Sequence, residues 1–271
     1  MKKVLIFVLM LCLSSLFGCK KISDSSKTYG DFIYEIVPLN EDGEDVRYPD
    51  VKNKNVVEKF VRIRKITEEA KLKKTLVVPQ YVEGIEVKEI GWRGLPICNW
   101  NTRVLEKIYI PFLPKKIYDP SVSCQFIILT NVIPDDVELQ VYAYITSFYH
   151  EEGVSNNFVP EIKGINSYNC SNCRFANVSY MYNYDEAPND GYYWIDDYEY
   201  GEIITYRPED PIRDGYLFGG WYKEKECINK WNFDDDKLPE EINPGAHQYS
   251  YQETILFAKW VNVEENHYYN S

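Results

Sequence analysis

Apolar and polar residues alternate along much of this chain, in short runs that end at turn residues. Alternation with a period of two is typical of strands that bury one face. Residues 31–38, DFIYEIVP, alternate in this way, and an acidic turn at residues 41–44 follows them. The same reading predicts further strands over residues 56–66, 76–78, 85–90, 105–110, 177–184 and 203–206. Tyrosine, valine and isoleucine are plentiful and favour strands, so we predict a mainly β or α+β fold.

The first 19 residues follow a different pattern. Two lysines precede an apolar run at residues 4–17, and Gly18 and Cys19 close it. A positive start, an apolar run and a small residue match a secretory signal peptide. The run is shorter than the roughly 20 residues that a membrane-spanning helix needs, so a transmembrane anchor is the weaker interpretation.

The tetrad at residues 16–19, LFGC, resembles the lipobox of bacterial lipoproteins. The resemblance implies cleavage before Cys19 and a diacylglyceryl thioether on its sulfur; an ordinary secreted protein is the alternative. Two or more acyl chains hold a protein firmly to a membrane. We therefore predict a lipoprotein signal peptide at residues 1–18 and a polar tether at residues 19–30. The protein would be lipid-anchored at the cell membrane, on the extracytoplasmic cell surface, with the membrane as a partner.

A spaced pattern recurs between residues 75 and 134. Residues 75–91, TLVVPQYVEGIEVKEIG, place a strand and a proline ahead of a second strand. A strand followed by proline returns at residues 105–111 and again at residues 129–134. The prolines that end the second and third copies of this pattern, Pro111 and Pro134, lie 23 residues apart. This spacing is within the period of leucine-rich repeats.

These segments resemble BspA-like leucine-rich repeats, although the usual Ala-Phe near the end of each repeat is replaced, for example at residues 94–95. The resemblance implies a short, irregular β-solenoid over residues 31–175, in which stacked repeats bury what one repeat cannot. A set of β-hairpins without solenoid order is the alternative. The predicted apolar ladder consists of Leu76, Val78, Ile90, Ile108, Ile110, Ile128 and Ile133.

A second motif lies nearer the C-terminus. Its members, in order, are Arg213, Gly215, Tyr216, Phe218, Gly220, Trp221, Tyr222, Trp231, Phe233, Ala258, Lys259 and Trp260. This order resembles the B-repeat of internalins, also called the Listeria–Bacteroides repeat. The resemblance implies a small β-grasp-like module over residues 176–262, built from strands and one short helix or turn, with residues 263–271 as a tail.

The aromatic residues of this motif have two interpretations. Large aromatic side chains supply much of the apolar area of a small core, and a core role is typical of the family. An exposed row of rings could instead stack on sugars. The chain as a whole has 24 tyrosines, which either fill small β-domains or offer contact area on a binding surface.

Charge excludes one class of partner. The formal net charge is −12 at pH 7, whereas nucleic acid is bound by basic patches, so we predict no nucleic-acid partner. Removal of residues 1–18 leaves 28 basic against 42 acidic residues, a net charge of −14. The acidic pairs and triplets at residues 196–197 and 234–236 lack the alternating ligands and glycine of a calcium loop, so we predict solvated acidic faces and no metal site.

Five cysteines follow Cys19, and an odd number leaves at least one unpaired in a monomer. Cys170 and Cys173 form a lone Cys-x-x-Cys, without the second pair or the histidines that structural zinc would need. A local disulfide and two plain thiols remain alternatives for this pair. The others, Cys98, Cys124 and Cys227, are expected to be small buried residues.

No catalytic motif is present. The sequence lacks a phosphate loop, a GxSxG elbow, an HExxH pair and a dinucleotide fingerprint. We therefore predict no catalytic residue, no cofactor and no enzymatic activity. The leading interpretation is a non-catalytic bacterial surface lipoprotein whose face binds an unknown extracellular protein or glycan, as in adhesion. The alternatives are a structural spacer or assembly component of the cell envelope and a glycan-active enzyme.

Overall fold

The computed structural model describes residues 26–91, 104–119, 124–130, 134–141, 146–148, 173–241 and 251–266. The predicted signal peptide, Cys19, Cys98 and Cys170 lie outside these ranges. Within them the chain is nearly all strand, turn and irregular backbone, which confirms a mainly β protein. The short helical pieces are η2 (Ala70–Leu72), η3 (Asn189–Gly191) and α2 (Val263–Asn266).

None of the helices in the described ranges is long and apolar enough to cross a membrane.

An antiparallel ribbon opens the described chain. Strand β2 (Phe32–Leu39) pairs with β1 (Lys27–Tyr29) on one side and β3 (Glu58–Ile66) on the other. Gly30 makes the turn between β1 and β2 at a φ of +52°, where glycine is favoured. Strand β1 falls inside the predicted tether, so regular structure begins four residues before the expected boundary at residue 31.

From β3 onward the chain alternates between two sheets, and apart from β5 the strands that it adds pair in parallel. One sheet has the order β1-β2-β3-β6-β8-β10, with β5 paired to β6, and the other has the order β12-β11-β9-β7-β4. Up to β11, each pass of the chain thus adds a strand to each sheet, and β12 then follows in the second sheet. We call this part the wound region. Its further strands are β4 (Thr75–Val77), β5 (Tyr81–Val82), β6 (Ile85–Gly91), β7 (Lys107–Ile110), β8 (Lys116–Asp119), β9 (Gln125–Ile128), β10 (Glu138–Val141), β11 (Thr146–Phe148) and β12 (Cys173–Phe175).

Stacked rows of apolar side chains fill the space between these two sheets. In the first sheet, register places Ile63, Ile90, Ile117 and Leu139 next to one another across four strands, and all are buried. The second sheet contributes Leu76, Val78, Ile108, Ile110, Phe126 and Ile128. The described members of the predicted ladder are therefore buried as expected, while Ile133 lies outside the described residues. The leucine-rich-repeat assignment itself stays a prediction.

The opposite face of the first sheet carries a row of alternating charges. Register aligns Glu35, Arg62, Glu89, Lys116 and Glu138 across β2, β3, β6, β8 and β10. Arg62 lies 2.9 Å from Glu35 and 2.5 Å from Glu89. Opposite charges on neighbouring strands favour this register over a slipped one.

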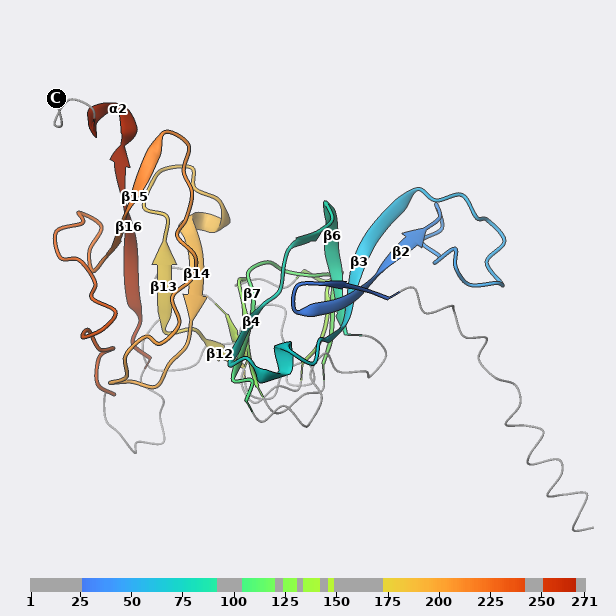
Figure 1. Ribbon diagram of the computed structural model, residues 1–271, viewed down its shortest axis with the longest axis horizontal. Coiled ribbons are helices and arrows are strands. Elements are labelled where there is room, and N and C mark those ends of the chain that lie inside the picture. The colour runs from blue at the N-terminus through green and yellow to red at the C-terminus, as the bar shows by residue number, and fades with distance from the viewer. Residues whose placement is uncertain are drawn as a thin grey trace, which may run out of the picture.

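The C-terminal region is a mixed sheet of β13 (Val178–Met181), β14 (Tyr192–Asp196), β15 (Tyr216–Tyr222) and β16 (Thr254–Asn262), in the order β14-β13-β16-β15. The central pair, β13 and β16, is parallel, and the outer pairs are antiparallel. The segment at residues 197–215 joins β14 to β15 without a helix. The β-grasp-like assignment therefore stays a prediction. Figure 1 shows this sheet at one end of the molecule, the β2–β3 ribbon at the other and the wound region between them.

Motif aromatics fill much of the C-terminal core. Trp221 and Trp231 are buried in this core. Phe218 and Trp260 are partly buried and pack against it. Arg213 lies over the Tyr216 ring, 3.8 Å from its centroid, which gives the motif arginine a packing role. The core interpretation of these rings is thus correct for the two buried tryptophans.

Candidate binding groove

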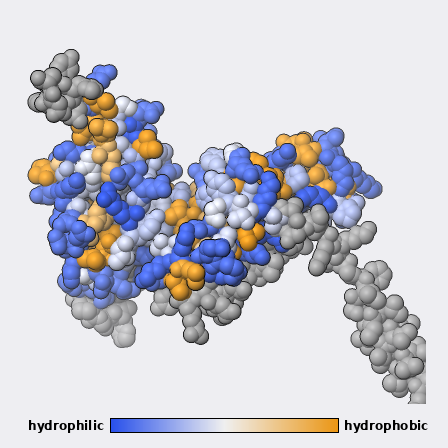
Figure 2. Space-filling model, in the orientation of Figure 1, coloured by the Kyte–Doolittle hydropathy of each residue, from blue (hydrophilic) through white to orange (hydrophobic). Residues whose placement is uncertain are grey.

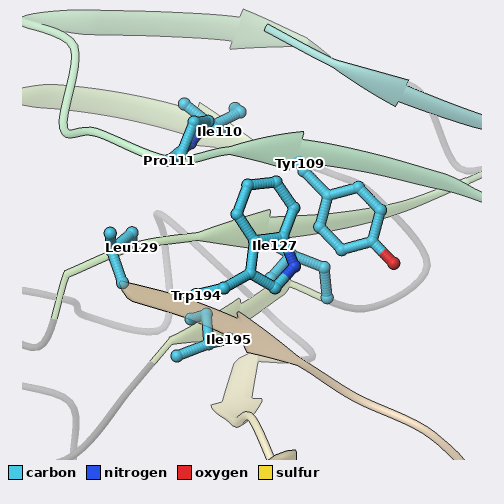
Figure 3. A pocket seen from close by; sticks show the side chains of 7 residues that line it. All are labelled: Tyr109, Ile110, Pro111, Ile127, Leu129, Trp194 and Ile195. Carbon is cyan, nitrogen blue, oxygen red and sulfur yellow. The ribbon is translucent and has the colours of Figure 1, made fainter. Parts of the chain in front are cut away.

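The outer face of the second parallel sheet packs directly against β14. Tyr109 and Ile127 point outward from β7 and β9, because their neighbours Ile108 and Phe126 point into the wound region. Trp194 lies 4.8 Å from Tyr109 between ring centroids. Figure 3 shows these side chains facing one another across a cavity of about 10 Å³, room for about one water molecule. One continuous apolar cluster therefore joins the wound region to the C-terminal sheet.

Asp196 anchors this contact at the end of β14. Its side chain is fully buried and accepts hydrogen bonds from Lys107 Nζ and Tyr109 Oη, each at 2.7 Å. Lys107 also donates to the Asp197 carbonyl at 2.7 Å and lies 3.5 Å from the centroid of the Tyr198 ring. Lys107 and Tyr109 both lie on β7. Because residues two apart on a strand share a face, both side chains reach Asp196.

Asp197 repeats the arrangement with three other strands. Its Oδ2 accepts from Arg174 Nε at 2.5 Å, Gln125 Nε2 at 2.7 Å and Ser147 Oγ at 2.9 Å. Burial raises the pKa of Asp197, and the donors from Arg174 and Ser147 oppose that rise only in part. We call Lys107, Tyr109, Gln125, Ser147, Arg174, Asp196 and Asp197 the junction network.

The junction network corrects one prediction. The sequence predicts a solvated acidic face at residues 196–197, but both side chains are fully buried. They are buried because the second sheet supplies a cation to each, and buried carboxylates need such partners. Among residues 234–236, Asp234 and Asp235 are exposed as expected. The described residues hold no cluster of three acidic, histidine or cysteine side chains suited to a metal ion.

A groove of about 380 Å³ opens beside the junction. Its lining comes from both regions and consists of Val77, Gln80, Pro111, Leu129, Tyr182, Asn189, Tyr193, Trp194, Tyr206 and Glu209. Pro111, Leu129 and Trp194 also line the small cavity of Figure 3. The groove exists only because the two regions pack together, since neither contributes the whole lining.

Packing fixes the aromatic side chains of the groove. The Tyr206 ring stacks on Tyr109, with centroids 4.7 Å apart and planes at 22°. The Tyr182 and Tyr193 rings meet edge to face at 5.2 Å. Tyr193 Oη donates to the Glu209 carbonyl at 2.6 Å. The rings are therefore held in place before any ligand arrives.

The polar groups of the groove are mostly neutral. Among the described residues, no partner is found for the hydroxyls of Tyr182 and Tyr206, and burial raises the pKa of each phenol. Gln80 and Asn189 add exposed amides. Glu209 is the one charged side chain among the described lining residues. This lining can bind a ligand through ring faces and hydrogen bonds, but it does not bring two carboxylates together as a glycosidase requires.

The cysteines that the structure describes do not line the groove. Cys124 is buried and Cys227 is half-buried. Cys173 lies in β12, whereas Cys170 is outside the described ranges. The sequence analysis did not single out Tyr182, Tyr193 or Tyr206 as site residues. Each was one tyrosine among many, and only the packing of β14 against β7 and β9 distinguishes them.

Comparisons with known proteins agree with the C-terminal motif. Residues 177–243 match the family model of the Listeria-Bacteroides repeat domain. A protein of Evansella cellulosilytica, described as "Putative Gly-rich membrane protein", is 36% identical over 62 residues. The aligned part covers 23% of this chain and 6% of that relative. The family match supports the B-repeat resemblance for this region, and the chain spans only a small fraction of the relative's length.

Proposed function

We propose that this protein is a non-catalytic bacterial surface protein that binds an extracellular protein or glycan in the groove between its two regions. The observation that carries the proposal is the groove itself, with fixed aromatic walls and with tyrosine hydroxyls that find no partner among the described residues. A concave site with apolar walls and a few convergent polar groups is typical of ligand binding. The repeat-domain match and the membrane-protein relative support a surface location.

The domain organisation belongs to the same proposal. Residues 31–175 would be a degenerate BspA-like leucine-rich-repeat region, and the alternation of strands between two parallel sheets supports it. Residues 176–262 would be a β-grasp-like B-repeat domain, followed by a tail at residues 263–271. The fold alone does not define the ligand, so the function rests on the groove.

Membrane attachment would occur through lipid on Cys19, after removal of residues 1–18. The test is substitution of this cysteine. Cys19→Ala should release the protein from the membrane fraction into the medium, and Cys227→Ala should leave it membrane-bound. Unchanged partition of Cys19→Ala into the detergent phase would contradict lipid anchoring.

Binding is tested with the full-length protein in detergent, offered to panels of extracellular proteins and glycans. We expect a ligand that binds the native chain and is lost in Tyr206→Ala. Tyr29→Ala is the matched control, because Tyr29 is exposed on β1 and is not among the lining residues. If no panel member binds at high micromolar concentration, the spacer interpretation replaces this one.

A further inference from the structure

The composition of the groove lining selects a class of ligand. We propose that the groove binds neutral carbohydrate, with pyranose rings against its aromatic walls and sugar hydroxyls on its unpaired polar groups. This inference rests on the binding function proposed above and narrows it to one ligand chemistry. Three properties of the lining carry it: its rings, its half-buried or exposed hydrogen-bonding groups and its charge.

The rings suit a flat, partly apolar ligand. One face of many pyranose rings consists of C–H bonds, and it packs well against an aromatic face. Tyr206 is fixed by its stack on Tyr109, and Tyr193 is fixed by its hydrogen bond to the Glu209 carbonyl and by stacking on Trp221 at 5.8 Å. Because these rings are already ordered, binding costs little side-chain entropy.

The hydrogen-bonding groups favour a ligand rich in hydroxyls. Tyr182 and Tyr206 are half-buried, and no partner is found for their hydroxyls within the described residues. An apolar ligand would cover these hydroxyls without replacing their bonds to water, which costs free energy. The amides of Gln80 and Asn189 both donate and accept, as sugar hydroxyls do.

Charge argues against an anionic ligand. The only charged side chain among the described lining residues is Glu209, which is exposed. The nearby cations Lys107 and Arg174 are already bound to Asp196 and Asp197. Figure 2 shows that the described residues on the face in view are mostly hydrophilic, with scattered apolar patches, and the whole chain has a net charge of −12. A sulfated or carboxylated sugar would find no free cation in this lining.

Size argues against a folded protein as the occupant. The groove volume of about 380 Å³ lies within the roughly 300–1,000 Å³ of small-ligand pockets. A stable protein partner instead buries about 800 Å² on each side. A short segment of a glycan chain fits the groove without needing contacts outside it.

The experiment is a glycan array followed by titration calorimetry, with the full chain in a zwitterionic detergent that carries no sugar. Neutral glucose and N-acetylglucosamine tetrasaccharides and a sulfated tetrasaccharide are the titration probes. We expect binding of a neutral glycan, weakened about tenfold or more by Tyr206→Ala. Gln80→Ala, at an exposed position, should weaken it about two- to tenfold. Tyr29→Ala should bind normally.

Salt provides a second readout. A rise in sodium chloride from 0.05 to 0.5 M should change the affinity for the neutral glycan by less than about twofold, because a neutral ligand has no charge to be screened. A strong loss of affinity with salt would show that binding depends on ion pairs and would overturn the neutral-carbohydrate assignment.

The outcomes separate the ligand class from the binding function. A protein ligand lost in Tyr206→Ala, without neutral-glycan binding, would overturn the carbohydrate assignment and leave the proposed function intact. Preference for the sulfated probe would do the same. Neutral-glycan binding that is unchanged in both Tyr206→Ala and Gln80→Ala would overturn the groove as the site. Absence of any glycan or protein ligand would overturn both proposals.

Discussion

Two adjacent carboxylates hold the wound region against the C-terminal sheet. Asp196 and Asp197 receive donors from β7, β9, β11 and β12, which lie 23 to 90 positions earlier in the chain. In the sequence they are two acidic residues in a strongly acidic chain, and nothing local distinguishes them from surface residues. Only their distant partners make burial favourable, so their role could not be predicted from the local pattern.

Removal of the Asp197 charge should weaken the junction. Asp197→Asn leaves Arg174 at the junction without its carboxylate, and breaking such a buried pair costs about 3–5 kcal/mol. We expect a loss of about 2–4 kcal/mol in the free energy of unfolding, because Arg174 keeps some access to solvent. Urea unfolding followed by tryptophan fluorescence measures it. Asp214→Asn, at an exposed position, should change stability by less than about 0.5 kcal/mol.

Asp45 should make the stability of the β2–β3 ribbon depend on pH in the acidic range. Burial alone would raise the pKa of Asp45, but hydrogen bonds from Arg47 outweigh it and hold the pKa below its usual value. The Asp45 carboxylate therefore adds its full contribution to the free energy of unfolding above the ordinary aspartate pKa of about 3.9. This contribution is lost as pH falls through the lower pKa that Asp45 has in the folded protein.

The test compares the native chain with Asp45→Asn by urea unfolding at pH 7 and near pH 2. We expect the native chain to be more stable at pH 7 and the difference to shrink at low pH. Asp42→Asn, on the same loop and exposed, serves as the control. A stability difference that stays constant with pH would contradict this role of Asp45.

At the scale of elements, the charged row on the first sheet fixes how its strands align. Glu35, Arg62 and Glu89 lie on β2, β3 and β6, and Arg62 contacts both carboxylates. Because the side chains of a strand alternate in direction, a one-residue slip would turn these charges toward the apolar rows inside. The row thus stabilises the register that stacks Ile63, Ile90 and Ile117.

Neutralising one member of the row should reduce stability. Glu89→Gln removes one of the two carboxylates beside Arg62 in a buried setting, and we expect a loss of about 1–3 kcal/mol. Glu86→Gln on the same strand is half-exposed, with Lys88 3.7 Å away, and should cost less than about 1 kcal/mol. Equal effects of the two variants on the urea midpoint would show that the row adds nothing specific.

Alternation predicted several strands well. Residues 31–38, 56–66 and 85–90 correspond closely to β2, β3 and β6. Residues 203–206 form only an isolated bridge, between Ile203 and Lys237, because the chain there runs beside the groove and not along a sheet. Strand β8 was missed, since Lys116–Asp119 is too short for a clear period and pairs only through the winding of the chain.

At the scale of the whole molecule, the groove is a product of assembly. Its lining joins residues near 77–80, 111–129 and 182–209, and no single stretch contains the site. The sequence indicated the two regions and their order, and it indicated many tyrosines. It could not indicate which tyrosines meet, because that depends on the buried contact between Tyr109, Trp194 and Asp196.

The junction network should make the two regions unfold as one unit. Differential scanning calorimetry of the native chain measures this cooperativity. We predict a single transition whose calorimetric and van't Hoff enthalpies agree, as for a two-state unit, and a broadened or divided transition in Asp197→Asn. Two separate transitions in the native chain would show that the regions unfold independently and would contradict the claim.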